Sequence, residues 1–227
     1  SSVSHSGVTA TLTPSSYLSE NSTISATLTT NVTDLAGNGL ASNYSWSFTT
    51  GDFTAPIIAE VTPVTSLTND NTPSYTFSST ETGTITYGGS CSSSTTEAAS
   101  GNNSIDLSTL SDGTYDNCTV TVTDSAGNAG NTITLTSFTI ETVAPTVSSS
   151  TPADSTNPVA IDTNISLTFS EVMDNSTITT NTANTSCSGT LQVSSDNFSN
   201  CIQMSSSPTA SSDNSTFTVT PSSSLSR

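Results

Sequence analysis

The sequence is almost without positive charge. Its 227 residues include one Lys or Arg, which is Arg227, and one His. Neutralising the phosphates of a nucleic acid needs several basic side chains, and so does docking on an anionic membrane surface. No run of about 18 apolar residues could form a membrane-spanning helix. We therefore expect no nucleic-acid partner and no membrane insertion. Any signal peptide is expected to have been removed or to lie upstream.

Charge of either sign is scarce. Only 8% of the residues are charged, and 18 acidic side chains against one basic give a net charge of -17. Salt bridges therefore cannot hold this fold together. Ser, Thr and Asn take the place of charged residues on the surface, so stability must come from apolar burial, backbone hydrogen bonds and covalent links.

The chain has four cysteines and none of them forms a C-x-x-C pair. We expect two local disulfides, Cys91–Cys118 and Cys187–Cys201, and an oxidising compartment. The alternative is two pairs of buried thiols.

Short runs of alternating apolar and polar residues predict β-strands throughout. The interleaved residues are mostly Ser, Thr or Asn, which suit an exposed strand face. No apolar stripe has the helical period of 3.6 residues. The alternating apolar residues are Ala10, Leu12, Ile24, Ala26, Leu28, Tyr44, Trp46, Phe48, Tyr75, Phe77, Ile85, Tyr87, Val120, Val122, Ile165, Leu167, Phe169, Leu191, Val193, Phe217 and Val219. The fold is predicted to be all-β, with sheets packed in two layers.

Turn motifs separate these runs. The similar segments Asp34–Asn38 and Asp124–Asn128 each follow one predicted strand and precede another, and both are predicted to be hairpin loops. Asp112–Tyr115, just before Cys118, resembles the tyrosine corner of immunoglobulin-like sandwiches. Because Cys118 shares parity with the alternating valines that follow it, its sulfur should face the core.

Two internal similarities indicate how the chain is organised. Ser47–Thr49 recurs as Ser137–Thr139, about 90 residues later, which is the size of one sandwich domain. Over a longer range, Thr9–Ser19 aligns with Thr216–Ser226, 207 positions later. The chain therefore ends inside the pattern with which it begins.

We infer three domains. Residues 1–52 are the back part of one sandwich type, 53–142 are a complete domain of another type, and 143–227 are the front part of the first type. Half a sandwich would leave an open core and a naked edge. The two parts are therefore expected to complete each other between successive copies, in a covalent tandem array or by head-to-tail assembly of subunits. Closure within one chain is the alternative.

Three segments are similar to known domains: Asn43–Thr50, Val143–Val147 and Asn164–Met173 resemble bacterial Ig-like domains of the SbsA/Big type. The middle domain, with Thr72–Phe77, is similar to another bacterial Ig-like repeat of very large surface proteins. The resemblance implies tandem extracellular β-sandwiches that act as stalks, adhesins or surface-layer parts. The partial end domains depart from the family pattern.

The function expected is structural: a repeat unit of an extracellular filament or surface stalk, whose partners are copies of itself. An adhesin repeat that binds a glycan or protein receptor is the alternative, and an accessory part of an extracellular hydrolase is a third. The sequence has no motif of a catalytic site, and the isolated His5 is expected in a solvated loop, so no enzymatic activity is predicted.

Calcium is the one cofactor that the sequence suggests, because carboxylates without basic partners suit a hard cation. The candidate ligands are Asp34, Asp52, Asp124 and Glu141, with Asn69–Asn71 as a further cluster. The alternative is that the two loop aspartates cap their own turns.

Two further features concern the surface. Trp46 is expected in a core, not in a sugar-binding site, because it shares parity with two other aromatic residues. Asn-x-Ser/Thr sequons are frequent, but a chain of this composition produces them by chance, so glycosylation is left open. They are Asn21, Asn31, Asn43, Asn102, Asn117, Asn164, Asn175, Asn184, Asn197 and Asn214.

Overall fold

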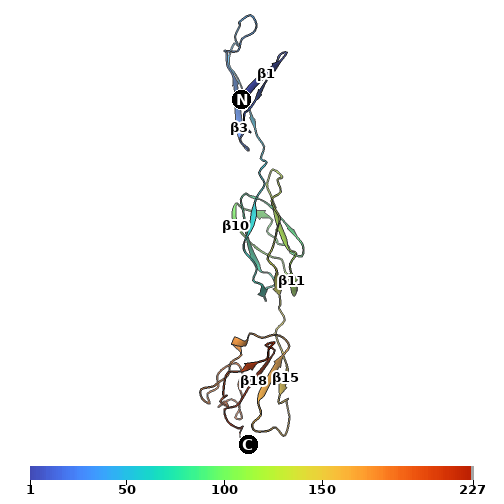
Figure 1. Ribbon diagram of the computed structural model, residues 1–227, viewed down its shortest axis with the longest axis vertical. Coiled ribbons are helices and arrows are strands. Elements are labelled where there is room, and N and C mark those ends of the chain that lie inside the picture. Colours follow the sequence, from blue (N-terminus) through green and yellow to red (C-terminus); the bar gives the residue numbers. More distant parts are fainter. Residues whose placement is uncertain (226–227) are drawn as a thin grey trace. The chain divides into compact units, whose positions relative to one another are not determined.

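The computed structural model describes residues 1–225 and confirms an all-β fold (Figure 1). Within that range the helical element is one 3-10 turn, η1 (Asn175–Thr177), and no helix is long and apolar enough to cross a membrane. The described chain forms two compact units, Ser1–Thr142 and a second that begins at Val143. Ser226 and Arg227, which end the longer similarity, lie outside the described residues.

Residues 56–142 form a complete sandwich of three small sheets. Their strand orders are β10-β7-β5, β11-β14-β6 and β13-β12-β8-β9. The strands are β5 (Ile58–Thr62), β6 (Leu67–Thr68), β7 (Ser74–Ser79), β8 (Gly83–Gly88), β9 (Glu97–Ala98), β10 (Gly101–Asp106), β11 (Gly113–Tyr115), β12 (Thr119–Thr123), β13 (Ile133–Thr134) and β14 (Phe138–Ile140).

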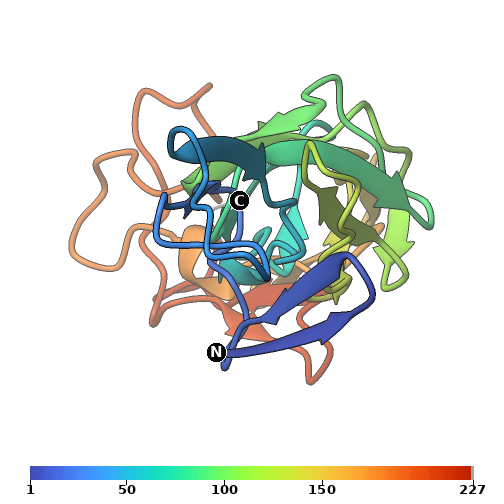
Figure 2. The ribbon, with the colours of Figure 1, turned by 90° about the horizontal axis from the view of Figure 1, so that it is seen from above.

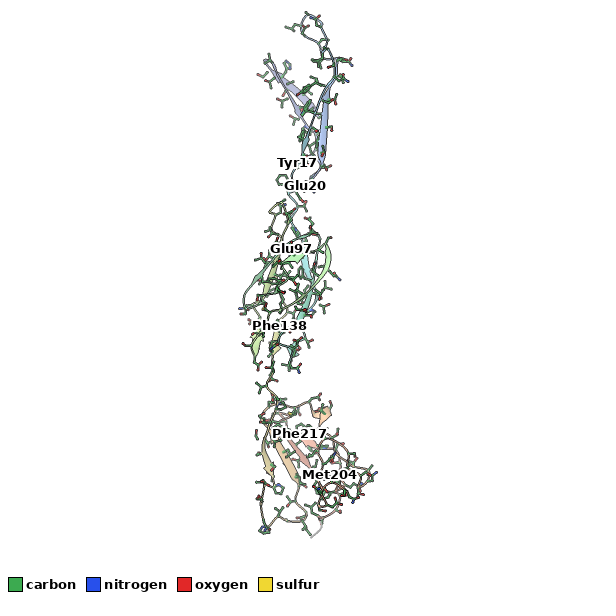
Figure 3. The ribbon with its side chains drawn as sticks, turned by 180° about the vertical axis from the view of Figure 1, so that it is seen from behind. Tyr17, Glu20, Glu97, Phe138, Met204 and Phe217 are labelled. Carbon is green, nitrogen blue, oxygen red and sulfur yellow. A yellow bond between two sulfur atoms is a disulfide. The ribbon has the colours of Figure 1, made fainter. Side chains whose placement is uncertain are left out.

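The alternation of apolar and polar residues along the strands determines which side chains form the core of this sandwich. In β12, Val120 and Val122 are almost fully buried and the threonines that alternate with them are partly exposed. The β7 side chains Tyr75 and Phe77 are buried in the same cluster as the β14 side chain Phe138. Of these three, Figure 3 labels Phe138. Burial of this apolar surface replaces the missing ion pairs as the source of stability.

The tyrosine corner is present. The Tyr115 hydroxyl donates a 2.8 Å hydrogen bond to the carbonyl oxygen of Ser111, four residues upstream, and its ring stacks on Phe138 with centroids 5.4 Å apart. Three residues later, Cys118 is 1% exposed, so its sulfur faces the core as its parity predicts.

Both expected disulfides are present. Cys91–Cys118 joins two segments of the middle sandwich across 27 residues, and Cys187–Cys201 closes a 14-residue separation in the second unit. Free cysteines are absent among the described residues, so the alternative of buried thiols is wrong.

The first 50 residues form two separate hairpins. β1 (Ser2–Ser6) pairs with β2 (Thr9–Thr13), and β3 (Thr23–Leu28) pairs with β4 (Tyr44–Thr49), each in a two-stranded antiparallel sheet. The β1–β2 hairpin is the dark blue pair of strands beside the N label in Figure 2.

The expectation of a core position for Trp46 is wrong for this chain. Its side chain is 48% exposed, and its neighbours Tyr44 and Phe48 are 64% and 45% exposed. Parity correctly places the three aromatic rings on one face of β4. That face of the two-stranded β3–β4 sheet lacks a tightly packed second layer.

The second unit contains one four-stranded sheet, of order β15-β16-β18-β17. Its strands are β15 (Val147–Thr151), β16 (Ile165–Phe169), β17 (Thr209–Ala210) and β18 (Thr216–Val219). Of the residues in β18, Phe217 and Val219 are each 1% exposed, as is the loop residue Met204 (Figure 3).

The strand expected at Leu191 and Val193 is absent. Residues 178–208 are irregular, with the Cys187–Cys201 disulfide and local hydrogen bonds in place of a ladder. Gly189 has a φ of +84°, a conformation that interrupts a strand, and its Cβ position would lie 2.7 Å from the Thr179 carbonyl oxygen.

Candidate functional site

The face of the β3–β4 hairpin that includes Trp46 is apolar and uncovered. The register pairs Ile24 with Phe48, Ala26 with Trp46 and Leu28 with Tyr44, so six apolar side chains share this face. The opposite face is polar, and the Thr27 and Ser45 hydroxyls lie 2.8 Å apart there. A contiguous apolar face of this kind marks an interaction surface.

A groove of about 660 Å³ lies between the two hairpins. Apolar residues from both hairpins and from the segment between them make up most of its lining: Val3, Ala10, Leu12, Pro14, Leu18, Ile24, Ala26, Leu28, Trp46 and Phe48. Leu12 is 62% exposed and Val3 is 70% exposed. The arrangement matches two facing layers of a sandwich that lacks some of its strands.

The second unit is also incompletely covered. The β16 residues Ile165, Leu167 and Phe169 are each only partly buried, although a central strand of a packed sandwich should bury its inner face. Leu167 pairs with Phe217 across the sheet, and the rings of Phe169 and Phe217 meet edge to face at 6.0 Å. The sheet is thus fully covered at β18, where Phe217 and Val219 are 1% exposed, and only partly covered at β16.

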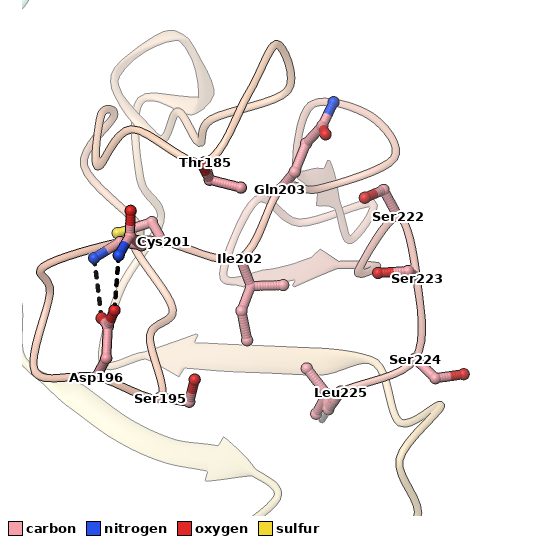
Figure 4. A pocket seen from close by; sticks show the side chains of 11 residues that line it. Thr185, Ser195, Asp196, Cys201, Ile202, Gln203, Ser222, Ser223, Ser224 and Leu225 are labelled. Carbon is pink, nitrogen blue, oxygen red and sulfur yellow. Dashed lines mark hydrogen bonds between the residues drawn. The ribbon is translucent and has the colours of Figure 1, made fainter. Parts of the chain in front are cut away.

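A smaller and mostly polar cavity of about 300 Å³ lies in the second unit (Figure 4). Asp196 and Asn200 lie at its wall. The Asn200 backbone N–H and side-chain amide donate to the two oxygens of Asp196, at 2.9 and 2.8 Å. Ile202 and Leu225 are its apolar residues, and the others are Thr185, Ser195, Cys201, Gln203, Ser222, Ser223 and Ser224.

The Asp196 loop shares part of the geometry of the two hairpin loops recognised in the sequence. An asparagine four residues later donates to both carboxylate oxygens, but the backbone N–H of Phe198 donates to the Ser194 hydroxyl and not to Asp196. At Asp34, Oδ1 accepts from the backbone N–H groups of Ala36 and Asn38 at 2.9 and 2.8 Å, and Oδ2 accepts from the Asn38 side chain at 2.9 Å. Asp124 makes the same contacts with Ala126 and Asn128. The spacing Asp-x-x-x-Asn was the signal that could have identified the third loop.

These hydrogen bonds show that Asp34 and Asp124 cap their own turns. The Asn38 side chain and backbone, which donate to it, lower the pKa of Asp34. Burial by itself raises the pKa of Asp124, but donation from Asn128 outweighs it, and the pKa lies below its ordinary value. Gly37 and Gly127 occupy equivalent places with φ of +87° and +94°, which the loop requires.

The structure brings two of the four calcium candidates together. Carboxylate oxygens of Asp52 and Asp124 lie within 4.8 Å of each other and of an oxygen of Glu81, which the sequence did not single out. Burial, followed by the charges of Asp52, Asp124 and Glu20, raises the pKa of Glu81. Hard oxygen ligands at this spacing suit Ca²⁺, and calcium at this position stays a prediction.

The other candidates lie elsewhere. Asp34 is in the loop after β3, and Glu141 follows β14, where its backbone N–H donates to Thr68. Asp70 accepts from the Thr72 backbone and so caps its own turn. His5 is exposed in β1, opposite Ala10, and not in a loop.

The segment near Asp52 is tied to the middle sandwich. The Asn128 side chain donates to the carbonyl oxygens of Asp52 and Thr54, at 3.2 and 3.4 Å. The Thr54 hydroxyl donates to Glu20 at 2.7 Å, and Figure 3 labels Glu20. The Asp124 loop therefore contacts the stretch that leads from β4 to β5.

Two family models match the chain, and both are described as bacterial Ig-like domain. One matches residues 1–50 together with 141–227, and the other matches residues 61–142. A search among curated proteins finds no match. Because the first model alone spans more than half of the sequence, the chain belongs to the bacterial Ig-like domain family.

Proposed function

We propose that this chain is a structural repeat unit of an extracellular filament or surface stalk, in which the back part of one copy completes the front part of the next. Bacterial Ig-like domains are generally structural and are common in surface proteins. The two disulfides fit an oxidising compartment outside the cytoplasm.

One observation is the main support for this proposal. The β3–β4 hairpin exposes a six-residue apolar face, and the partly buried β16 strand belongs to the other segment that the same family model matches. The same family model thus matches two segments that are separated by the middle sandwich. Each of the two segments has apolar side chains that are not fully covered, and each could cover those of the other.

Completion between copies allows two forms of polymer. In a covalent tandem array, the repeat of 207 positions places a new back part directly after each front part. In a non-covalent polymer, the same contact joins separate chains head to tail. Closure within one chain is the remaining arrangement and would yield a monomer.

The chemistry of the chain suits an exposed load-bearing role. A disulfide limits how far a domain extends when it unfolds under force, and the Cys91–Cys118 bond restrains 27 residues of the middle sandwich. Lys and Arg are absent before Arg227, so trypsin has no internal cleavage site.

The mass of the native chain under denaturing and reducing conditions tests this proposal. A ladder or a much larger species indicates a covalent array. A mass of 23.0 kDa, with ordered fibres of the purified chain in electron micrographs, indicates non-covalent assembly. A chain of 23.0 kDa that stays monomeric at high concentration would contradict the filament.

An adhesin is the second candidate, and the polar cavity at Asp196 favours it. Serine hydroxyls and an Asn–Asp pair offer hydrogen bonds to a small polar ligand such as a sugar. Glycan arrays with the purified chain test this function. Glycan binding without self-association supports the adhesin, whereas fibres without glycan binding support the scaffold.

A further inference from the structure

The β1–β2 and β17–β18 hairpins are two copies of the same structural element. The similarity between Thr9–Ser19 and Thr216–Ser226 places β2 and β18 at matching positions. Gly7 and Asn214, 207 positions apart, both have positive φ, of 57° and 53°, in the turns that precede these strands. The second turn is two residues wider, because the pairs nearest the turns are Ser6↔Thr9 in the first hairpin and a Ser211–Thr216 backbone hydrogen bond in the second.

The second copy is already built into a sheet. β18 pairs with β16 from Ile165↔Val219 to Thr168↔Thr216, and two hydroxyl pairs between the strands lie 2.8 and 3.0 Å apart. In the first copy, β1 and β2 pair only with each other. Equivalent residues also differ in how far their face of the sheet is covered: Val219 is 1% exposed, so its face of β18 is already covered, whereas its counterpart Leu12 is 62% exposed.

We infer that the β3–β4 hairpin alone is the element that passes from one copy to complete the second unit of another, while β1–β2 takes no part in the contact. This inference rests on the proposed function and names its contact surface. The position beside β16 is filled by β18 of the same chain, so a β1–β2 hairpin from another copy has no vacant edge there to occupy.

The groove of the first 50 residues shows how the contact is made. There, the apolar face of β3–β4 lies across from β2, with Leu18 in the same lining. Leu225 is the counterpart of Leu18, and Phe217 is the counterpart of Ala10. Replacing β1–β2 by its copy β17–β18 therefore places the apolar face of β3–β4 across from the sheet that contains β18. Because Phe217 and Val219 of β18 are already 1% exposed, the surface left for Trp46 and Phe48 is the partly buried β16 beside it.

The two surfaces match in chemistry. The face of β3–β4 offers six apolar side chains and no charge. On the receiving sheet, the partly buried Ile165, Leu167 and Phe169 lack full cover. The polar outer face of the hairpin, with Ser25, Ser45 and Ser47, stays in water. The completed sandwich then has the usual two layers, one of β15-β16-β18-β17 and one that contains β3-β4.

A mixture of two full-length variants provides a direct test. The acceptor is the 227-residue chain with Trp46→Phe and Phe48→Asp, so that it has no tryptophan and its own hairpin docks weakly. The donor is the wild-type chain at low concentration, in which Trp46 is the single tryptophan, so its fluorescence reports docking of the donor hairpin. We expect a saturable shift of its emission to shorter wavelength as the acceptor is added, because the indole leaves water.

Matched variants of the donor chain define the surface. Phe48→Asp on the apolar face should weaken binding at least about tenfold, because it buries an unpaired carboxylate. Ser47→Asp, on the opposite face, should leave binding within about twofold. A peptide of residues 1–19 at equal concentration should not compete.

Each outcome decides the inference separately from the filament. No emission shift of the donor chain, or reversal of the shift by the 1–19 peptide, overturns the inference even if the wild-type chain forms fibres. A shift that Phe48→Asp abolishes supports it even if the purified chain does not polymerise, and then points to a covalent array.

Discussion

Trp46 lies directly opposite Ala26 across the β3–β4 hairpin, and 48% of its surface remains exposed. The small alanine leaves the indole standing above its neighbour, next to the ring of Tyr44 at 5.8 Å. A large aromatic side chain in this setting contributes little to the stability of an isolated hairpin. Its burial would contribute to the contact with a second layer.

The Cys91–Cys118 disulfide should stabilise the middle sandwich. Replacing both cysteines by alanine removes a constraint over 27 residues and should lower the free energy of unfolding by about 3–4 kcal/mol. Urea denaturation followed by circular dichroism measures the change. The matched pair Cys187→Ala and Cys201→Ala lies in the second unit and should leave this transition in place. Equal effects of both pairs on the middle sandwich would argue against separate units.

Tyr115→Phe should weaken the tyrosine corner. The variant keeps the ring that stacks on Phe138 but loses the hydrogen bond to Ser111, so the free energy of unfolding should fall by about 1 kcal/mol. Tyr17→Phe is a suitable control, because Tyr17 is fully exposed. An unchanged urea midpoint for Tyr115→Phe would show that the hydroxyl bond adds no net stability.

Asp34 and Asp124 should make the folding stability decrease at acidic pH. Both have lowered pKa values in the folded chain because the asparagine four residues later donates to the carboxylate. Their stabilisation is therefore present above the unfolded pKa near 4 and is lost as pH falls through the lower folded pKa. Asp124→Asn should lower the melting temperature at pH 7 and flatten this decline. A decline with unchanged amplitude in the variant would assign the effect to other carboxylates.

Glu81 should have the opposite effect on the pH dependence of stability. Its pKa is raised by burial and by the charges of Asp52, Asp124 and Glu20, so the folded chain binds the proton more readily than the unfolded chain. This stabilisation appears as pH falls and is lost as pH rises through the raised pKa. Without divalent cations, Glu81→Gln should therefore raise the melting temperature at pH 7, whereas the exposed Glu97→Gln should not.

Bound calcium would reverse the effect of Glu81→Gln on the melting temperature, because the wild-type carboxylate would then be a ligand. If Ca²⁺ binds Asp52, Glu81 and Asp124, added calcium should raise the wild-type melting temperature and EGTA should reverse the increase. The Glu81→Gln chain should respond less than the Glu97→Gln chain. Identical wild-type melting curves in calcium and in EGTA would remove calcium from the account.

Local patterns were enough to predict the strands and the covalent links. Alternation put Val120 and Val122 in a core, and the parity of Cys118 predicted the direction of its sulfur. Parity identifies the face of a strand but not whether another layer covers it, which is why the expected burial of Trp46 was wrong.

Contacts between distant loops left no signal in the sequence. Glu81 follows β7 and meets Asp52 and Asp124 only because the fold brings three separate segments together. The strand predicted from the alternation of Leu191 and Val193 is wrong, since Gly189 and the nearby disulfide accompany an irregular path there.

Acrylamide quenching of Trp46, the single tryptophan, tests completion between copies most directly. The measurement compares the native surface assembly from the source cells with the purified 227-residue chain at low concentration. We expect strong quenching of the separate chain and protection in the assembly, where a second copy covers the indole. Equal and strong quenching in both preparations would show that the β3–β4 face stays uncovered and would contradict the account.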